Sequence, residues 1–191
     1  HNATGSPTVY SVQGTGVEAT FTITPPNLDF GNVVIGSNST LQSTVSNPGT
    51  SDLVISSITS SDAQFTFLPN TFPITITPGG NQLIDITYTP TATGLTLADL
   101  TFTHNASGSP TVYSVEGTGI DAIEPSINAL NLINVIAGTS TDSLITVTNN
   151  SMTPLLVTAN ITAAPNWDIA PDTVTIPAGG NNLFMLSFIA P

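Results

Sequence analysis

The chain has 191 residues, 39% of them hydrophobic and 6% charged, and its formal net charge is −12 because it contains no Lys or Arg. Nucleic-acid binding and attachment to anionic membrane surfaces both depend on Lys and Arg, so the composition excludes them. The absence of Cys excludes disulfides, thiolate nucleophiles and Cys-ligated metals. Since no apolar run approaches the roughly 18 residues of a membrane-spanning helix, we expect no membrane insertion of this segment.

One stretch occurs twice in the chain. HNATGSPTVYSVQGTG, residues 1–16, returns 103 positions later (104 − 1) as HNASGSPTVYSVEGTG, residues 104–119, with only two pairs different. A period near one hundred residues matches an immunoglobulin-sized domain repeated in tandem and is too long for a solenoid repeat. We therefore expect three parts: a closing strand of a preceding or neighbouring domain at 1–16, a complete sandwich at 17–119, and a second sandwich at 120–191 without its last strands.

In the first repeat, short runs with alternating apolar residues are separated by Gly, Pro and Asn turn signals. The last long run, residues 94–105, changes its apolar phase between Leu97 and Leu100, which predicts a bulge. Residues 17–24 read as an extended connector that leads to Pro25 and Pro26. The predicted strands are 7–12, 28–36, 41–46, 53–58, 64–68, 72–77, 82–89, 94–105 and 110–115.

The second repeat shows the same pattern in different residues. Residues 130–138 correspond to 28–36, and residues 144–150 correspond to 42–48. Near the end of the chain, Phe184, Leu186 and Phe188 take the inward places of Ile84, Ile86 and Tyr88. Because no helical period occurs, the predicted fold is all-β, with tandem antiparallel immunoglobulin-like β-sandwiches of which the last is incomplete.

The runs LDFGNVVIG, SNPGTSDLVIS and EGTG together resemble the hydin and abnormal-spindle (ASH) group of immunoglobulin-like domains. The chain is closer still to the tandem copies of that group in bacterial surface proteins of the choice-of-anchor type. The resemblance covers nearly all of residues 25–119 and is weaker in the second repeat, where Leu132 and Ile133 replace Phe30 and Gly31. It implies a scaffold or adhesin stalk built from repeated sandwiches, and its motif contains no catalytic positions.

The second repeat has no counterpart of residues 91–119, so a sheet edge and part of a core would be exposed. One hypothesis is that residues 1–16 of one molecule complete the second domain of its neighbour by strand addition. The equivalents of residues 91–103 would still remain unsupplied. The alternative is that the chain, which begins at His1, is a window of a longer covalent array. The candidate assembly strand carries Pro7, Val9, Tyr10 and Val12.

Acceptor patterns for N-glycosylation occur five times, so covalent glycans are expected partners if the source organism glycosylates its surface proteins. Two of the acceptors share one repeat position, in the loop before the closing strand, where we expect exposure. The candidates are Asn2, Asn38, Asn105, Asn149 and Asn160.

Other candidates for chemistry are weak. His1 and His104 are the same repeat position, and neither has the neighbouring His or Cys that a zinc site needs. Glu116, Asp121 and Glu124 could bind calcium at the domain junction, but a solvated linker is the favoured interpretation. We therefore expect no metal, no cofactor and no enzyme activity.

The aromatic residues Trp167, Tyr10, Tyr88 and Tyr113 could form a sugar-stacking platform, but their small number favours a place in the core. The leading prediction is a structural subunit of an extracellular fibre or surface stalk, with neighbouring copies of itself as partners. Two alternatives stay open: an adhesin or carbohydrate-binding module, and an accessory domain of a larger secreted enzyme.

Overall fold

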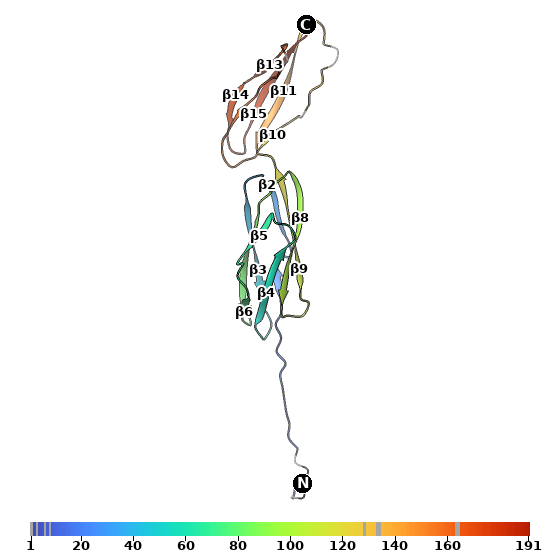
Figure 1. Cartoon of the computed structure of the whole chain (residues 1–191), viewed down its shortest axis with the longest axis vertical. Coiled ribbons are helices and arrows are strands. Elements are labelled where there is room, and N and C mark those ends of the chain that lie inside the picture. Colours follow the sequence, from blue (N-terminus) through green and yellow to red (C-terminus); the bar gives the residue numbers. More distant parts are fainter. Residues whose placement is uncertain are drawn as a thin grey trace.

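The computed structural model describes residues 2, 4–5, 7, 9–127, 129–132, 135–162 and 165–191. Two β-sandwiches follow one another end to end, and the N-terminal segment extends away from the first of them (Figure 1). The described residues form strands and no helix, as the sequence predicts. Accordingly, no helix in this part of the chain is long and apolar enough to cross a membrane.

The first sandwich consists of a four-stranded and a five-stranded sheet. The four-stranded sheet is antiparallel throughout and has the order β1-β3-β7-β5. The five-stranded sheet has the order β2-β9-β8-β4-β6. The strands are β1 (Thr22–Thr24), β2 (Leu28–Val34), β3 (Ser39–Ser46), β4 (Leu53–Ser60), β5 (Phe65–Leu68), β6 (Ile74–Ile76), β7 (Asn81–Tyr88), β8 (Gly94–His104) and β9 (Thr111–Ile120).

One strand pair departs from the predicted antiparallel pattern: β2 and β9 run parallel. Leu28 lies opposite Val115 and Val34 lies opposite Ile120, with a register shift between Asp29 and Asn32. At this shift Gly31 adopts φ +60°, and its N–H donates to Asp29 Oδ1 at 2.7 Å. A left-handed residue is tolerated here because glycine has no Cβ.

The core of the first sandwich lies between its sheets and is built from alternate residues of each strand. In β8, Ala98, Leu100 and Phe102 point inward and are buried, whereas Leu95 and Leu97 are exposed. The predicted bulge between Leu97 and Leu100 is therefore wrong, because β8 keeps a continuous register with β9 and simply carries two leucines on its outer face. The irregularity lies instead in β4, between Ile55 and Ser57.

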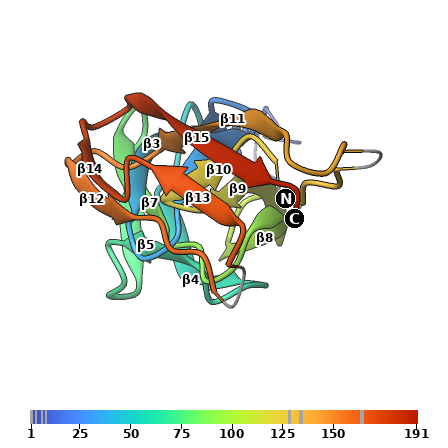
Figure 2. The ribbon, with the colours of Figure 1, turned by 90° about the horizontal axis from the view of Figure 1, so that it is seen from above.

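The second sandwich repeats the four-stranded sheet in the order β10-β11-β15-β13, and among its described residues two strands, β12 and β14, face this sheet. Viewed along the long axis, these two strands lie to one side of the molecule (Figure 2). The strands are β10 (Ile123–Pro125), β11 (Ser140–Asn149), β12 (Leu155–Thr158), β13 (Trp167–Ala170), β14 (Thr173–Ile176) and β15 (Asn181–Ile189).

Two predicted strands are not found in the part of the chain that the structure describes. None of the described residues in 7–12 or in 130–138 belongs to a strand. The reason is the same for both: in the first sandwich their counterparts β9 and β2 pair with each other, and here each segment lacks that partner. An extended segment without a ladder leaves its backbone groups to water, so the apolar alternation alone does not make it a strand.

Candidate functional site

The uncovered inner face of the second sandwich is the most distinctive surface of the molecule. In the first sandwich β8 and β9 occupy the middle of the five-stranded sheet, between β2 and β4. In the second, β12 pairs only with β14, and its other edge, which corresponds to the β8 side of β4, has no strand beside it among the described residues. The two central strands that would complete this sheet are therefore not supplied by the described chain.

The strand registers show which residues correspond in the two sandwiches. Ser43 of β3 lies opposite Ile84, and Ile145 of β11 lies opposite Phe184. Ser43 and Ile145 therefore correspond to each other. In the same way, Trp167, which pairs with Phe188, corresponds to Phe65, which pairs with Tyr88. The burial of residues that match in register can therefore be compared between the two sandwiches.

This comparison shows a half-open core. Phe65 is 1% exposed and Tyr88 is 0% exposed, with ring centroids 4.6 Å apart. Their counterparts Trp167 and Phe188 also pack together, at 4.7 Å, but both are only partly buried. Next to them lies a hollow of about 390 Å³, lined by Leu130, Asn160, Ile161, Trp167, Ile169 and Leu186.

The predicted assembly strand projects into solvent. Val9 and Tyr10 are each 85% exposed and Val12 is 91% exposed, and Pro7 is exposed as well. The repeat copies of Tyr10 and Val12 in β9 are only 1% and 2% exposed. The same sequence is thus solvent-exposed as a free segment and part of the core when it is paired.

Tyr113 of β9 makes a contact that sequence analysis did not find. Its hydroxyl lies 2.8 Å from Ser43 Oγ, and both residues are buried. Burial raises the pKa of Tyr113, and the hydrogen bond to Ser43 opposes this rise. The signal that could have revealed the contact is a polar residue at an inward position of β3, where the neighbouring inward residue Val45 is apolar.

The Gly-Thr-Gly ending of β9 has a packing reason. A Cβ on Gly117 would lie 2.5 Å from Tyr88 Cε1 and 3.2 Å from Phe30 Cβ. The glycine therefore allows β9 to pass directly over the Tyr88 ring. Gly14, in the N-terminal copy, has the same spacing from Tyr10 that Gly117 has from Tyr113.

A single strand would not fill the gap in the second sandwich. Residues 7–16 copy β9, whereas the strand next to β4 in the complete sandwich is β8. With the copy alone, the position of β8 would remain open, together with the places of Ala98, Leu100 and Phe102. The geometry thus requires a hairpin of the β8–β9 kind for closure.

A buried asparagine anchors the end of β3 and of β11. Asn47 donates to the carbonyls of Ser51 and Ile76 at 2.8 and 2.9 Å, and its Oδ1 accepts from the N–H groups of Thr20 and Gly49. Asn149, also 0% exposed, repeats this role. Its Nδ2 donates to the carbonyls of Thr153, Ile176 and Pro177. The folded domain therefore has no room for a glycan on Asn149.

The other glycosylation candidates are exposed, but the side-chain amide of one of them is hydrogen-bonded. Asn2, Asn38 and Asn160 are exposed. Asn105 is exposed too, but its Nδ2 donates to Asp52 O at 3.0 Å and its Oδ1 accepts from Val54 N at 2.8 Å. A glycan on this amide would replace a bond that joins two loops.

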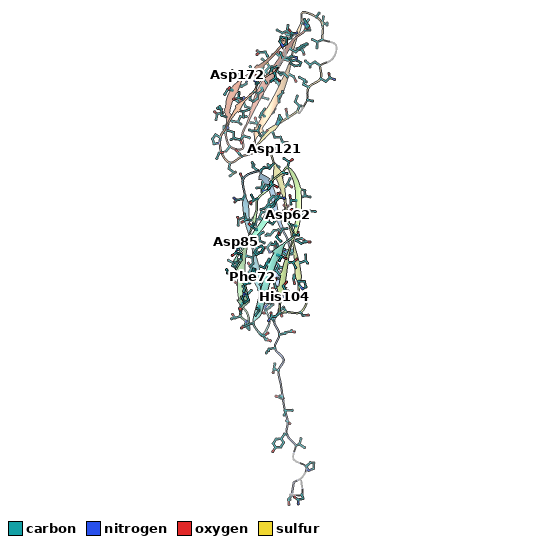
Figure 3. All side chains as sticks on the ribbon, in the orientation of Figure 1. Asp62, Phe72, Asp85, His104, Asp121 and Asp172 are labelled. Carbon is teal, nitrogen blue, oxygen red and sulfur yellow. The ribbon has the colours of Figure 1, made fainter. Side chains whose placement is uncertain are left out.

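His104 lies at the end of the first sandwich nearest the tail, as a structural residue (Figure 3). Its Nδ1 accepts from the Ala106 N–H at 3.2 Å, its Nε2 is 2.9 Å from Thr111 Oγ1, and its ring stacks on Phe21 at 4.5 Å. Burial lowers its pKa. His1, the residue at the same repeat position, lies outside the described residues.

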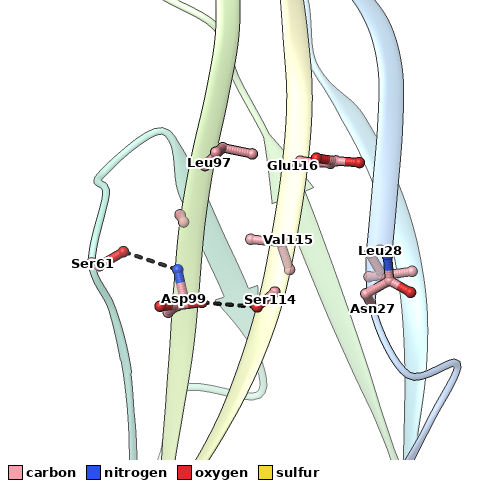
Figure 4. Close-up of a pocket in the computed structure, with 9 residues that line it drawn as sticks. Asn27, Leu28, Ser61, Leu97, Asp99, Ser114, Val115 and Glu116 are labelled. Carbon is pink, nitrogen blue, oxygen red and sulfur yellow. Dashed lines mark hydrogen bonds between the residues drawn. The ribbon is translucent and has the colours of Figure 1, made fainter.

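The acidic residues considered for calcium do not meet at one point. Glu116 lies on the outer face of β9, beside a hollow of about 350 Å³ that also contains Asp99 (Figure 4). There Asp99 Oδ1 accepts from Ser114 Oγ at 3.0 Å. Asp121 and Glu124 line a different hollow at the junction, where Glu124 Oε2 accepts from Asn150 Nδ2 at 3.2 Å. Within the described ranges, no three His, Asp or Glu residues are close enough to hold a metal.

The aromatic residues do not form a platform for sugars. Tyr88 and Tyr113 are buried in the first sandwich, Tyr10 lies on the free segment, and Trp167 lies in the second sandwich. Their separation follows from the fold, since each occupies a core or closing-strand position. The arrangement as a whole can pair strands and bury apolar side chains, and it offers no convergent set of catalytic groups among the described residues.

Comparison with known proteins gives one family match and several structural likenesses. Residues 19–118 match the HYDIN/CFA65/VesB-like, Ig-like domain. No curated protein matches the chain in sequence.

Three solved structures illustrate the structural likeness. A protein of unknown function from Porphyromonas gingivalis W83 has a TM-score of 0.46 and 14% identity, over 88% of this chain and 83% of that one. The ASH/PapD-like domain 7 of human CEP192 has a TM-score of 0.45 and 15% identity, over 63% of this chain and 99% of that one. The secreted serine protease VesC from Vibrio cholerae has a TM-score of 0.44 and 11% identity, over 90% of this chain and 46% of that one.

Proposed function

Because the chain belongs to the HYDIN/CFA65/VesB-like family of Ig-like domains, we propose that it is a structural segment of an extracellular fibre or surface stalk. The observation that carries this proposal is the path of the chain. The closing strand β9 leads directly into β10 of the next sandwich, at the end opposite to the tail (Figure 1). The tail, a copy of β9, stands before the first sandwich as β9 stands before the second.

A pulling force along this path would act on the β2–β9 pair in a geometry that resists separation. A load between the tail and the junction would act first on β1, which precedes β2 and pairs with β3. Through β1 it would pull the start of β2 and the end of β9 in opposite directions. Because β2 and β9 are parallel, their hydrogen bonds would be sheared together and would not open one after another. This resistance to shear supports a role in transmitting force.

Two ways of joining successive sandwiches are compatible with the path. Residues 7–16 of one copy could enter the second sandwich of a neighbour, or like sandwiches could follow each other in one polypeptide. An extracellular place is supported by the absence of Lys and Arg, which leaves trypsin-like proteases without a cleavage site. We propose Asn2, Asn38 and Asn160 as the positions for covalent glycans, and intact-mass measurement of the native protein would test this.

Single-molecule pulling tests the load-bearing function directly. The chain has no Cys, so pairs of introduced cysteines provide unique handles. Val17→Cys with Asp121→Cys loads the β2–β9 pair in shear, through β1 and its pairing with β3. Val17→Cys with Ser107→Cys is the matched control, because it opens the same pair from one end. We expect the first geometry to need a several-fold higher force, and equal forces in both would contradict a load-bearing role.

Light scattering and negative-stain imaging at increasing concentration distinguish the two ways of joining. Val12→Asp changes a tail residue whose counterpart Val115 is 2% exposed, and Ser11→Asp changes one whose counterpart Ser114 is exposed. Strings that the first substitution abolishes and the second preserves indicate exchange of the tail. Single particles at every concentration contradict exchange of the tail.

A further inference from the structure

We propose that the outer face of the five-stranded sheet in the first sandwich binds an extended segment of a partner protein, with an arginine at its centre and apolar residues on either side. The surface consists of outward residues of two neighbouring strands, and we call it the β8–β9 face: Leu95, Leu97, Asp99, Val112, Ser114 and Glu116. It lies along the side of this sandwich (Figure 1). The proposal goes beyond the proposed function, because it does not depend on how successive sandwiches are joined.

Three apolar side chains of the β8–β9 face project into solvent. Leu95 is 63% exposed, Leu97 is 65% exposed and Val112 is 58% exposed. The two leucines lie in the first part of β8, whereas Val112 pairs with Thr101, farther along that strand. The distance from residue 95 to residue 101 is roughly 20 Å, the length of about six extended residues. An extended segment that follows the two strands would therefore cover apolar side chains near both of its ends.

Two carboxylates lie between these apolar residues. In the register of β8 with β9, Leu97 is opposite Glu116 and Asp99 is opposite Ser114, so the two pairs form adjacent rows (Figure 4). Asp99 and Glu116 are therefore diagonal neighbours, at roughly 7–8 Å. Both line the hollow of about 350 Å³, together with Leu97. A guanidinium in this hollow could donate to both carboxylates, and the methylene groups of its arginine could lie on Leu97.

A third carboxylate adds to the negative charge at this point. Asp29 of β2 is in register with Glu116, on strands about 4.8 Å apart. Asp29 Oδ1 accepts from the Gly31 N–H at 2.7 Å. Asp99 Oδ1 accepts from Ser114 Oγ at 3.0 Å, so neutral donors hold both aspartates in place. Because like charges side by side on neighbouring strands are destabilising, a cationic partner would relieve a repulsion that the fold itself contains.

A second copy of this chain does not fit the β8–β9 face. The chain contains no Lys or Arg and has a formal net charge of −12, so another copy would place carboxylates against carboxylates. The charge is also not required by the closing-strand motif, since the first copy of the repeat has Gln13 where β9 has Glu116. Charge complementarity therefore favours a basic segment of a different protein.

Titration of the isotope-labelled full chain with a blocked seven-residue peptide tests the proposal by NMR. The probe carries Arg at its centre, Leu two places to either side and Thr elsewhere, and in the control peptide citrulline replaces Arg. We expect saturable chemical-shift changes for amides of β2, β8 and β9 with the arginine peptide. The citrulline peptide has a similar shape and no charge, so it should bind about fivefold more weakly or worse. Spermidine, which is cationic and has no peptide backbone, is the third probe.

Exchange of Glu116 for the amide that the repeat carries gives the matched variant. Glu116→Gln should weaken binding of the arginine peptide about fivefold, because one carboxylate is lost. Glu18→Gln changes the net charge equally at an exposed position outside the face, and it should leave the affinity unchanged. Without peptide, Glu116→Gln should not lower the urea midpoint of the first sandwich, since it removes the repulsion with Asp29. A lower midpoint would instead assign Glu116 a stabilising role and contradict the proposal.

The remaining outcomes also decide for or against the proposal. Equal binding of the arginine and citrulline peptides overturns it, as do equal affinities of Glu116→Gln and Glu18→Gln or shifts spread over the whole surface. Spermidine that binds as tightly as the arginine peptide overturns the assignment to a protein segment. Saturable shifts confined to the three strands, with the expected losses, support it. None of these results depends on the pulling experiment, so failure here is distinguishable from failure of the load-bearing function.

Discussion

The two sandwiches share a framework and differ in closure. Both place a four-stranded sheet in the same register, and both have a buried asparagine at the end of the corresponding strands β3 and β11, Asn47 or Asn149. In the first, β8 and β9 complete the core. In the second the same inward positions stay partly exposed, including Trp167 and Phe188. An apolar face is thus specified locally, whereas its burial depends on strands far away in sequence.

The difference in closure corresponds to a large difference in buried apolar side chains. Burying a large apolar side chain contributes roughly 1.5–3 kcal/mol, and β8 and β9 contribute Leu100, Phe102, Tyr113 and Val115 to the first core. Their absence amounts to on the order of 10 kcal/mol, which is comparable to the whole stability of a typical domain. We therefore expect the second sandwich to be much the less stable one until its open face is covered.

The largest effect is expected from Phe102→Ala. Phe102 is 0% exposed and packs against Phe21 and Tyr113, with ring centroids at 5.4 and 6.4 Å. Its removal should lower the free energy of unfolding of the first sandwich by about 3–5 kcal/mol. Circular dichroism in urea reports both sandwiches, and Trp167 fluorescence reports the second. The Trp167 transition should not move, and the exposed Thr103→Ala should change neither signal. A shift of the Trp167 midpoint would show that the sandwiches unfold together.

A smaller effect, of about 2–3 kcal/mol, is expected from Asn47→Ala and from Asn149→Ala, each in its own sandwich. Each substitution leaves buried backbone groups without a partner, such as the carbonyls of Ile76 and Ile176. Urea unfolding with the same two signals measures both variants, and the exposed Asn70→Ala is the control. If Asn149→Ala left the Trp167 transition unchanged, the second sandwich would not depend on the anchor that it shares with the first.

The smallest effect concerns pH and His104. Burial lowers its pKa below the ordinary value of 6.5, so below that value the unfolded chain takes up a proton before the folded one does. The contribution to stability is therefore complete above pH 6.5 and is lost as the pH falls toward the lowered pKa. Urea midpoints of the first sandwich should decline on acidification, and His104→Gln should flatten this slope. A rise of stability in the same interval would contradict the assigned neutral ring, whose Nδ1 accepts from Ala106.

Much of the architecture could be predicted from local pattern. The phase of one strand and a contact between distant strands could not. The alternation in β7, with Ile84, Ile86 and Tyr88 inward, is a short-range signal and was found. The phase of β8 was misjudged because Leu95 and Leu97 are apolar yet exposed. The pair of Ser43 and Tyr113 was missed because its members are seventy residues apart in sequence.

The all-β class, the turns and the inward residues of most strands could be read from the sequence alone, because they depend on neighbours along the chain. The hundred-residue period could be read from it because the same stretch occurs twice. The parallel pairing of β2 with β9, the burial of Asn149, and the lack of a strand among the described residues of 7–12 and 130–138 follow only from the assembled fold. A strand exists only when its backbone groups find a partner. Whether that partner is present is a property of the assembled sheets and not of the segment.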